Sequence, residues 1–171
     1  TMSRPRRKAP WLWPGYITRY VEPSVIVLLD TSSSMEVGLI RKILLDILEA
    51  TRKTVLISPG RPIYVSYDNK WIEIRDGSDV ENLEILTNPI ILVDAIENII
   101  GRVLIRESPY IVIIVSDWET PDKREALENS IRRLRALVDL IILVTVHGGI
   151  PAREETKICI LRYEDKSSLS P

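Results

Sequence analysis

A short stretch near the start of the chain brings together side chains that could bind a metal ion. Residues 30–34 read D-T-S-S-S, so that Asp30, Ser32 and Ser34 form the pattern D-x-S-x-S. The five apolar residues before them, 25–29, are typical of a strand that is buried on both faces. One carboxylate and two hydroxyls offer only oxygen, which suits a hard cation. The pattern therefore predicts a site for Mg²⁺ or Mn²⁺ at the carboxyl end of this strand.

A second apolar strand also ends in an acid. Residues 110–115 are continuously apolar, and Ser116 and Asp117 follow them. Strands that alternate with helices form a largely parallel sheet with right-handed crossovers, so the ends of these two strands are expected at one edge of the sheet. Asp117 is therefore expected near Asp30, although the two are far apart in the sequence. His147, the only histidine, also follows an apolar run and should lie at the same edge.

Hydrophobic periodicity predicts the elements that hold these strand ends in place. A helix is expected at 37–52, where apolar residues such as Ile40 and Ile43 recur at helical spacing. Two short β-prone runs around a polar turn predict a hairpin at 63–74. Further helices are expected to start at Asn88-Pro89 and at Thr120-Pro121-Asp122, further strands at 140–146 and 157–163, and a polar loop at 76–82.

The D-x-S-x-S pattern between a buried strand and a helix, together with the acidic end of a later strand, resembles the von Willebrand factor A (vWA) family. The resemblance implies an α/β fold with a Rossmann-like, mostly parallel sheet, one antiparallel edge strand from the hairpin, and helices on both faces. It also implies that Ser32 and Ser34 bind the metal directly. Asp30 and Asp117 would then bind it mainly through water.

Two positions depart from the family's pattern. The ending S-D-W-E is similar to the family's D-G-E, but Trp118 stands where glycine is usual, which concerns the backbone turn rather than the carboxylate. The family also supplies a threonine from the loop before the middle helix. Aligning Asp94 with that helix puts Ile90 at the threonine position, so Thr87 serves only if the loop is longer than usual. Thr87 is our prediction for this ligand, and a water molecule is the alternative.

Single residues also have simpler explanations. Side chains such as those in D-T-S-S-S cap the free amide groups at a helix start, but capping needs only one of them and does not account for Asp117. A lone histidine at a strand end is more often a hydrogen-bonding loop residue than a ligand, and this is our interpretation of His147. Cys159 lies within an apolar run and is expected in the core.

Length and composition favour one globular domain. The chain has 171 residues, of which 45% are hydrophobic and 27% charged, and this is too short for two domains of ordinary size. We predict a basic and aromatic N-terminal arm at 1–21, a vWA-like domain at 22–165 and a C-terminal tail at 166–171. Acids and bases nearly cancel, at 24 against 23, so the net charge indicates no partner.

The cysteine content and the apolar pattern bear on location. One cysteine cannot form an internal disulfide, which favours a reducing, cytoplasmic compartment. No run approaches the ~20 apolar residues of a membrane span, so no membrane partner is expected. The sequence contains no glutamine and many charged residues, a composition typical of a thermophile.

The arm at 1–21 allows two interpretations. Its positive charge comes from Arg4, Arg6, Arg7 and Lys8, and two tryptophans and two tyrosines follow them. In the first interpretation a mobile basic tip precedes an aromatic segment that packs on the domain. In the second, the arm binds nucleic acid, with basic groups on the phosphates and aromatic rings stacked on the bases.

The expected function is metal-dependent binding of another protein that offers a Glu or Asp carboxylate. The vWA resemblance also implies service as an adaptor, for example beside an ATPase in a larger assembly. A nucleic-acid-associated protein and a metal-dependent phosphohydrolase are the alternatives. The sequence has neither G-x-S-x-G nor a P-loop, and a phosphatase with a strand-end aspartate nucleophile would usually have a second acid where Ser32 stands. We therefore expect no catalytic activity.

The two interpretations of the arm differ in their effect on stability. Deleting residues 1–9 should leave the melting temperature unchanged, because no buried pattern lies there. Deleting residues 1–20 should lower it, because Trp11 and Trp13 would then be lost from the domain surface. Thermal unfolding of both truncated chains measures the difference. Equal melting temperatures would show that the tryptophans do not pack, and would favour the nucleic-acid interpretation.

Overall fold

The fold is built on one six-stranded sheet. The computed structural model describes residues 22–54, 57–88, 90–105, 109–147 and 153–163. The sheet has the order β3-β2-β1-β4-β5-β6, and all neighbours are parallel except the antiparallel pair β2–β3. The strands are β1 (Ser24–Leu29), β2 (Ile63–Tyr67), β3 (Lys70–Ile74), β4 (Tyr110–Ser116), β5 (Leu140–Thr145) and β6 (Ile158–Arg162).

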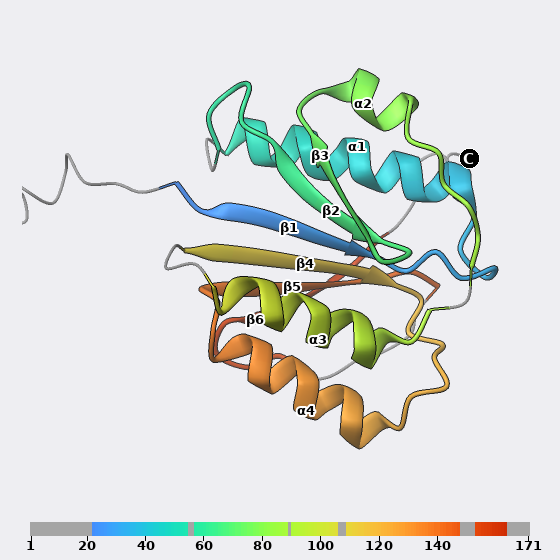
Figure 1. Ribbon diagram of the computed structural model, residues 1–171, viewed down its shortest axis with the longest axis vertical. Coiled ribbons are helices and arrows are strands. Elements are labelled where there is room, and N and C mark those ends of the chain that lie inside the picture. Colours follow the sequence, from blue (N-terminus) through green and yellow to red (C-terminus); the bar gives the residue numbers. More distant parts are fainter. Residues whose placement is uncertain (1–21, 55–56, 89, 106–108, 148–152, 164–171) are drawn as a thin grey trace, which may run out of the picture.

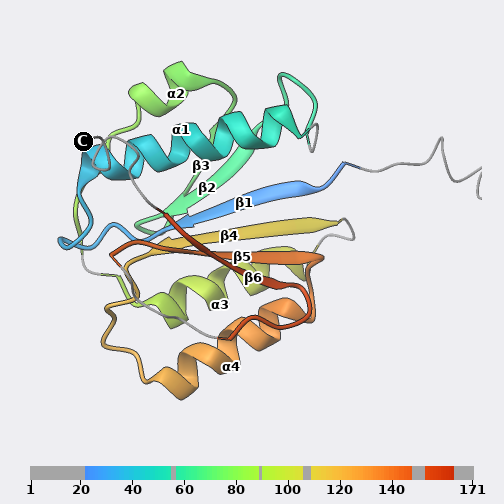
Figure 2. The same cartoon turned by 180° about the vertical axis from the view of Figure 1, so that it is seen from behind.

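Helices cover both faces of this sheet (Figures 1 and 2). One face carries α1 (Val37–Lys53) and the short α2 (Gly77–Glu81), and the other carries α3 (Leu92–Val103) and α4 (Arg124–Arg135). Two clusters of buried apolar side chains fill the two helix–sheet layers. The predicted α/β fold is therefore confirmed, including the antiparallel edge strand from the hairpin. No helix in the described part of the chain is long and apolar enough to cross a membrane.

The two central strands set the position of the candidate site. Every residue of β4 is buried, and β1 is buried from its second residue onward, which explains why both are apolar throughout. They pair in parallel from Ser24 opposite Tyr110 to Leu29 opposite Val115. The ladder continues one step further, because the Asp30 amide donates to the Val115 carbonyl at 2.9 Å. The polar residues after both strands therefore start at the same level of the sheet.

The predicted polar loop at 76–82 is wrong, because residues 77–81 form the helix α2. Asp76 caps this helix: its carboxylate accepts hydrogen bonds from the amides of Ser78 and Asp79, and the Asp79 side chain completes a capping box. The hydrogen bond from the Ser78 side chain, followed by that from the Asp79 amide, lowers the pKa of the Asp76 carboxyl. The capping pattern D-G-S-D was visible in the sequence, but the segment has too few apolar residues to show a helical period.

Two predicted helix starts are also wrong. The helix α3 begins at Leu92 rather than at Asn88, and α4 begins at Arg124 rather than near Thr120. The predicted caps instead make tertiary contacts. The Asn88 side chain donates to Asp68 at 3.0 Å, and Asp122 accepts the Val93 amide at 3.2 Å. Asp122 therefore satisfies a free amide at the start of α3, which has no capping side chain of its own.

Cys159 was predicted to be buried, and it is exposed. It lies on β6, an edge strand that is covered mainly on one face, so the apolar run does not imply burial on both faces. Its neighbour Ile158 points to the core and is 3% exposed. The arm at 1–21, the tail at 166–171 and the predicted first helical residue Pro89 lie outside the described residues.

Adjacent residues on β6 should respond differently to substitution. Ile158→Ala should lower the free energy of unfolding by about 2–5 kcal/mol, because it leaves a cavity under the sheet. Cys159→Ser should change it by less than about 0.5 kcal/mol, because the side chain is already in water. Urea unfolding of the two variants measures both values. A large loss for Cys159→Ser would contradict the assigned register of β6.

Candidate metal site

The site is built on Asp30, the first residue after β1. Its carboxylate is 2% exposed, and both of its oxygens accept hydrogen bonds. Oδ1 accepts from the Ser32 amide at 2.9 Å, and Oδ2 accepts from the Ser116 hydroxyl at 2.6 Å. The first bond closes the loop after β1, and the second ties that loop to the end of β4. Asp30 therefore fixes the positions of the residues around it.

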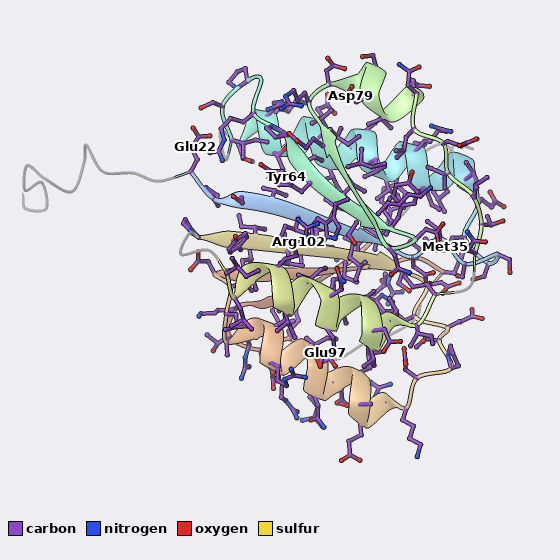
Figure 3. All side chains as sticks on the ribbon, viewed as in Figure 1. Glu22, Met35, Tyr64, Asp79, Glu97 and Arg102 are labelled. Atoms are coloured by element: carbon purple, nitrogen blue, oxygen red, sulfur yellow. The ribbon has the colours of Figure 1, made fainter. Side chains whose placement is uncertain are left out.

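The two motif serines lie side by side above Asp30. Their Oγ atoms are 3.1 Å apart, and the Ser34 hydroxyl donates to Oδ2 of Asp117. Because Ser34 gives its only proton to Asp117, Ser32 must be the donor in the contact between the serines. The loop is anchored below by Met35, which is 1% exposed and lies at the same edge of the sheet as the end of β1 (Figure 3).

The second carboxylate, Asp117, is 1% exposed and is held by the turn after β4. Its Oδ1 accepts from the Glu119 amide at 3.0 Å. Trp118 between them has a φ of 61°, a left-handed conformation that glycine adopts without strain and that costs another residue about 1–2 kcal/mol. The indole offsets this cost by packing on the α3–α4 side of the core and donating to the Val144 carbonyl at 3.3 Å. The tryptophan thus takes the backbone turn expected of glycine.

One member of this network was missed by sequence reasoning. The Ser116 side chain is fully buried, donates to Asp30, and accepts from the Trp118 amide at 2.9 Å. It therefore connects the two acidic strand ends. The signal available in the sequence was a hydroxyl that directly precedes Asp117 at the end of an otherwise apolar strand.

The four central residues fit a hard cation. Octahedral Mg²⁺ binds oxygen at 2.0–2.1 Å, so neighbouring ligand oxygens lie about 2.9 Å apart. The Ser32 and Ser34 oxygens are separated by 3.1 Å, close to that distance. Two ionised carboxylates stand directly behind them. The described residues contain no group of three or more His, Cys, Asp and Glu side chains suited to a metal, so half of this donor set is hydroxyl oxygen.

The two remaining candidates are less closely tied to the site. Thr87 is exposed, and its side chain makes no hydrogen bond to another described residue. Its neighbour Asn88 does contact the motif loop, because its amide donates to the Thr31 carbonyl at 2.9 Å. Thr87 therefore lies beside the loop, and its role as a ligand stays a prediction. His147 is exposed after β5, and no hydrogen bond joins it to the described site residues.

A solved structure shares this architecture. The VWA domain of SpRpn10 superimposes with a TM-score of 0.57 over 84% of this chain and 88% of its own, at 14% sequence identity. This chain has a von Willebrand factor A fold. The predicted resemblance is thus confirmed at the level of the fold, which is all that such a low identity shows. No family model and no curated protein matches the sequence.

The role of Ser116 in the vWA-like site can be measured by stability. Ser116→Ala removes one donor and one acceptor from a buried network, so it should lower the free energy of unfolding by about 1–3 kcal/mol without added metal. Ser130→Ala is the matched control. Ser130 is 3% exposed, but its hydroxyl makes no hydrogen bond to another described residue, so its loss should be nearly neutral. Equal effects in urea unfolding would show that the Ser116 network adds nothing.

Proposed function

We propose that this vWA-like domain binds another protein through a Mg²⁺ or Mn²⁺ ion held by Ser32 and Ser34. Asp30 and Asp117 support the ion from behind, and Thr87 or water completes the protein's side. The observation that carries the proposal is the pair of serine oxygens 3.1 Å apart, above two carboxylates that are almost completely buried. When bound, the ion supplies an electrophilic open position that takes a Glu or Asp carboxylate of the partner.

The hydrogen bonds of the site support this division of roles. Each aspartate already accepts two hydrogen bonds, and neither is more than 2% exposed. They provide negative charge at a fixed position, while the more accessible serines provide neutral oxygens. An ion held directly by neutral oxygens keeps much of its positive charge, and it therefore attracts an anionic group from outside.

The same contacts favour binding over turnover. A phosphohydrolase with Asp30 as nucleophile would need a free carboxylate oxygen facing the substrate. Both oxygens of Asp30 accept hydrogen bonds within the protein. The nucleic-acid alternative rests on the arm at 1–21, outside the described residues, and no observation of the described part favours it. An adaptor role beside an ATPase agrees with the proposal, but the partner is defined only by its carboxylate.

Metal binding should be visible as a gain in stability. At a free Mg²⁺ concentration of about 100 Kd, the folded state should gain roughly 2.7 kcal/mol, which raises the melting temperature by roughly 5–10 °C. Ser32→Ala and Ser34→Ala should lose this gain. Ser33→Ala should keep it, because Ser33 lies between them, is exposed and makes no hydrogen bond through its side chain to a described residue. An unchanged melting temperature of the parent chain in millimolar Mg²⁺ and Mn²⁺ would rule out the ion.

The same variants test partner binding. A physiological partner should be captured by the immobilised parent chain and by Ser33→Ala in Mg²⁺. It should be released by EDTA and should not be captured by Ser32→Ala. Neutralising one acidic residue of the partner should abolish capture. Capture that survives both the chelator and Ser32→Ala would show that binding does not use the metal.

A further inference from the structure

A second cavity lies directly beside the metal site. It has a volume of about 200 Å³ and lies between the ends of β1 and β2, the β2–β3 turn and the first turns of α3. Thr31, the residue between Asp30 and Ser32, forms part of its wall. The other polar residues that line it are Ser66, Asp68, Asn69, Asp94 and Asn98.

Two hydroxyl groups at this cavity have no partner within the protein. Thr31 is 1% exposed, and its Oγ1 atom is buried without a hydrogen bond to any described residue. Ser66 is 5% exposed, and its hydroxyl likewise bonds to no described residue. A buried hydroxyl without a partner destabilises the fold, so native structures nearly always satisfy it. A polar ligand in the cavity would supply the missing contact.

The charges around the cavity have one sign. Asp68 and Asp94 line it, and no lysine, arginine or histidine does so among the described residues. Asp68 is held in a two-residue turn in which Asp68 and Asn69 have φ values of 49° and 59°, as a type I′ hairpin requires. Burial raises the pKa of Tyr67 in the same wall, and the negative charges of Glu84 and Asp68 add to this effect.

We infer that this cavity binds the ammonium group of a lysine side chain. An ammonium group has three donors and no acceptor, so it suits a wall of carboxylate and hydroxyl oxygens. The volume is below the range of ordinary small-molecule sites and fits one side chain better than a cofactor. A divalent metal is less suited, because the described wall offers only two carboxylates and no group of three.

The inference deepens the proposed function, on which its second half rests. Thr31 separates the two sites by a single residue of the motif loop. One partner segment can therefore place a Glu or Asp at the metal and a Lys in the cavity. Such a partner is recognised by two charges of opposite sign, and a segment with only one of them loses half of the contacts.

The cavity can be tested without the metal. Nα-acetyl-lysine methylamide is titrated into the full ¹⁵N-labelled chain, with the norleucine analogue as a control that lacks the ammonium group. The lysine compound should shift the amide signals of Thr31, Ser66 and Asn98 in a saturable way, also in Ser32→Ala with EDTA. Shifts of equal size from norleucine, or no shifts from lysine, would overturn the inference.

Two matched variants locate the charge that is responsible. Asp94→Asn should weaken binding of the lysine compound at least tenfold. Glu125→Gln should leave it unchanged: Glu125 is the acid in the first turn of α4 as Asp94 is in α3, but it lies outside the cavity. Both variants treat the helix dipole alike, so the difference reports the cavity. Equal binding by the parent and Asp94→Asn would overturn the inference.

A peptide series tests joint recognition. Acetylated peptides carry Glu and Lys separated by one to four glycines, and each has a norleucine counterpart. In Mg²⁺, at least one Lys peptide should bind tenfold more tightly than its counterpart, and Asp94→Asn should remove that advantage. No advantage at any length would overturn recognition by one segment. Failure of the metal proposal alone appears separately, as the absence of any effect of EDTA on these peptides.

Discussion

The parallel pairing of β1 with β4 is the constraint on which the candidate site depends. Its register places Asp30 opposite Ser116, so two residues from distant parts of the chain meet in one hydrogen bond. A shift of one residue would turn the apolar side chains of each strand to the other face, and both faces are packed against helices. The hydrophobic core thus holds the site geometry far more firmly than the polar contacts could by themselves.

This geometry collects negative charge where water is scarce. Asp30 and Asp117 are each at most 2% exposed, and moving a carboxylate out of water costs several kcal/mol. Hydrogen bonds from amides and from Ser116 and Ser34 offset part of that cost, yet they add no positive charge. The strained turn at Trp118 adds to it. A cation would relieve this imbalance, and this is the physical reason why an arrangement that weakens the fold can be retained for binding.

The sequence predicted the fold and most of the site because both follow from strand periodicity. Continuous apolar runs marked β1 and β4, and the rule that parallel strands end at one edge brought Asp30 and Asp117 together. Features that depend on tertiary contacts were not predictable. Asn88 and Asp122 are good capping residues locally, but their side chains bond to Asp68 and to the start of α3. Cys159 is exposed because its strand has no outer neighbour among the described residues, a fact that no local pattern contains.

The cavity beside the site is the clearest case of this limit. Thr31 is the unremarked second position of D-x-S-x-S, and nothing in the motif distinguishes it from Ser33. In the fold the two differ completely, because Ser33 is exposed whereas Thr31 is buried against the ends of β2 and α3. Alternation along the loop thus sends Ser32 and Ser34 toward Asp117 and leaves the Thr31 hydroxyl on the side of Asp68 and Asp94. One five-residue loop thereby separates an environment suited to a carboxylate from one suited to an ammonium group. Because opposite charges are required on its two sides, a partner that reverses their order meets repulsion at both, and this gives the loop a direction as well as a charge preference.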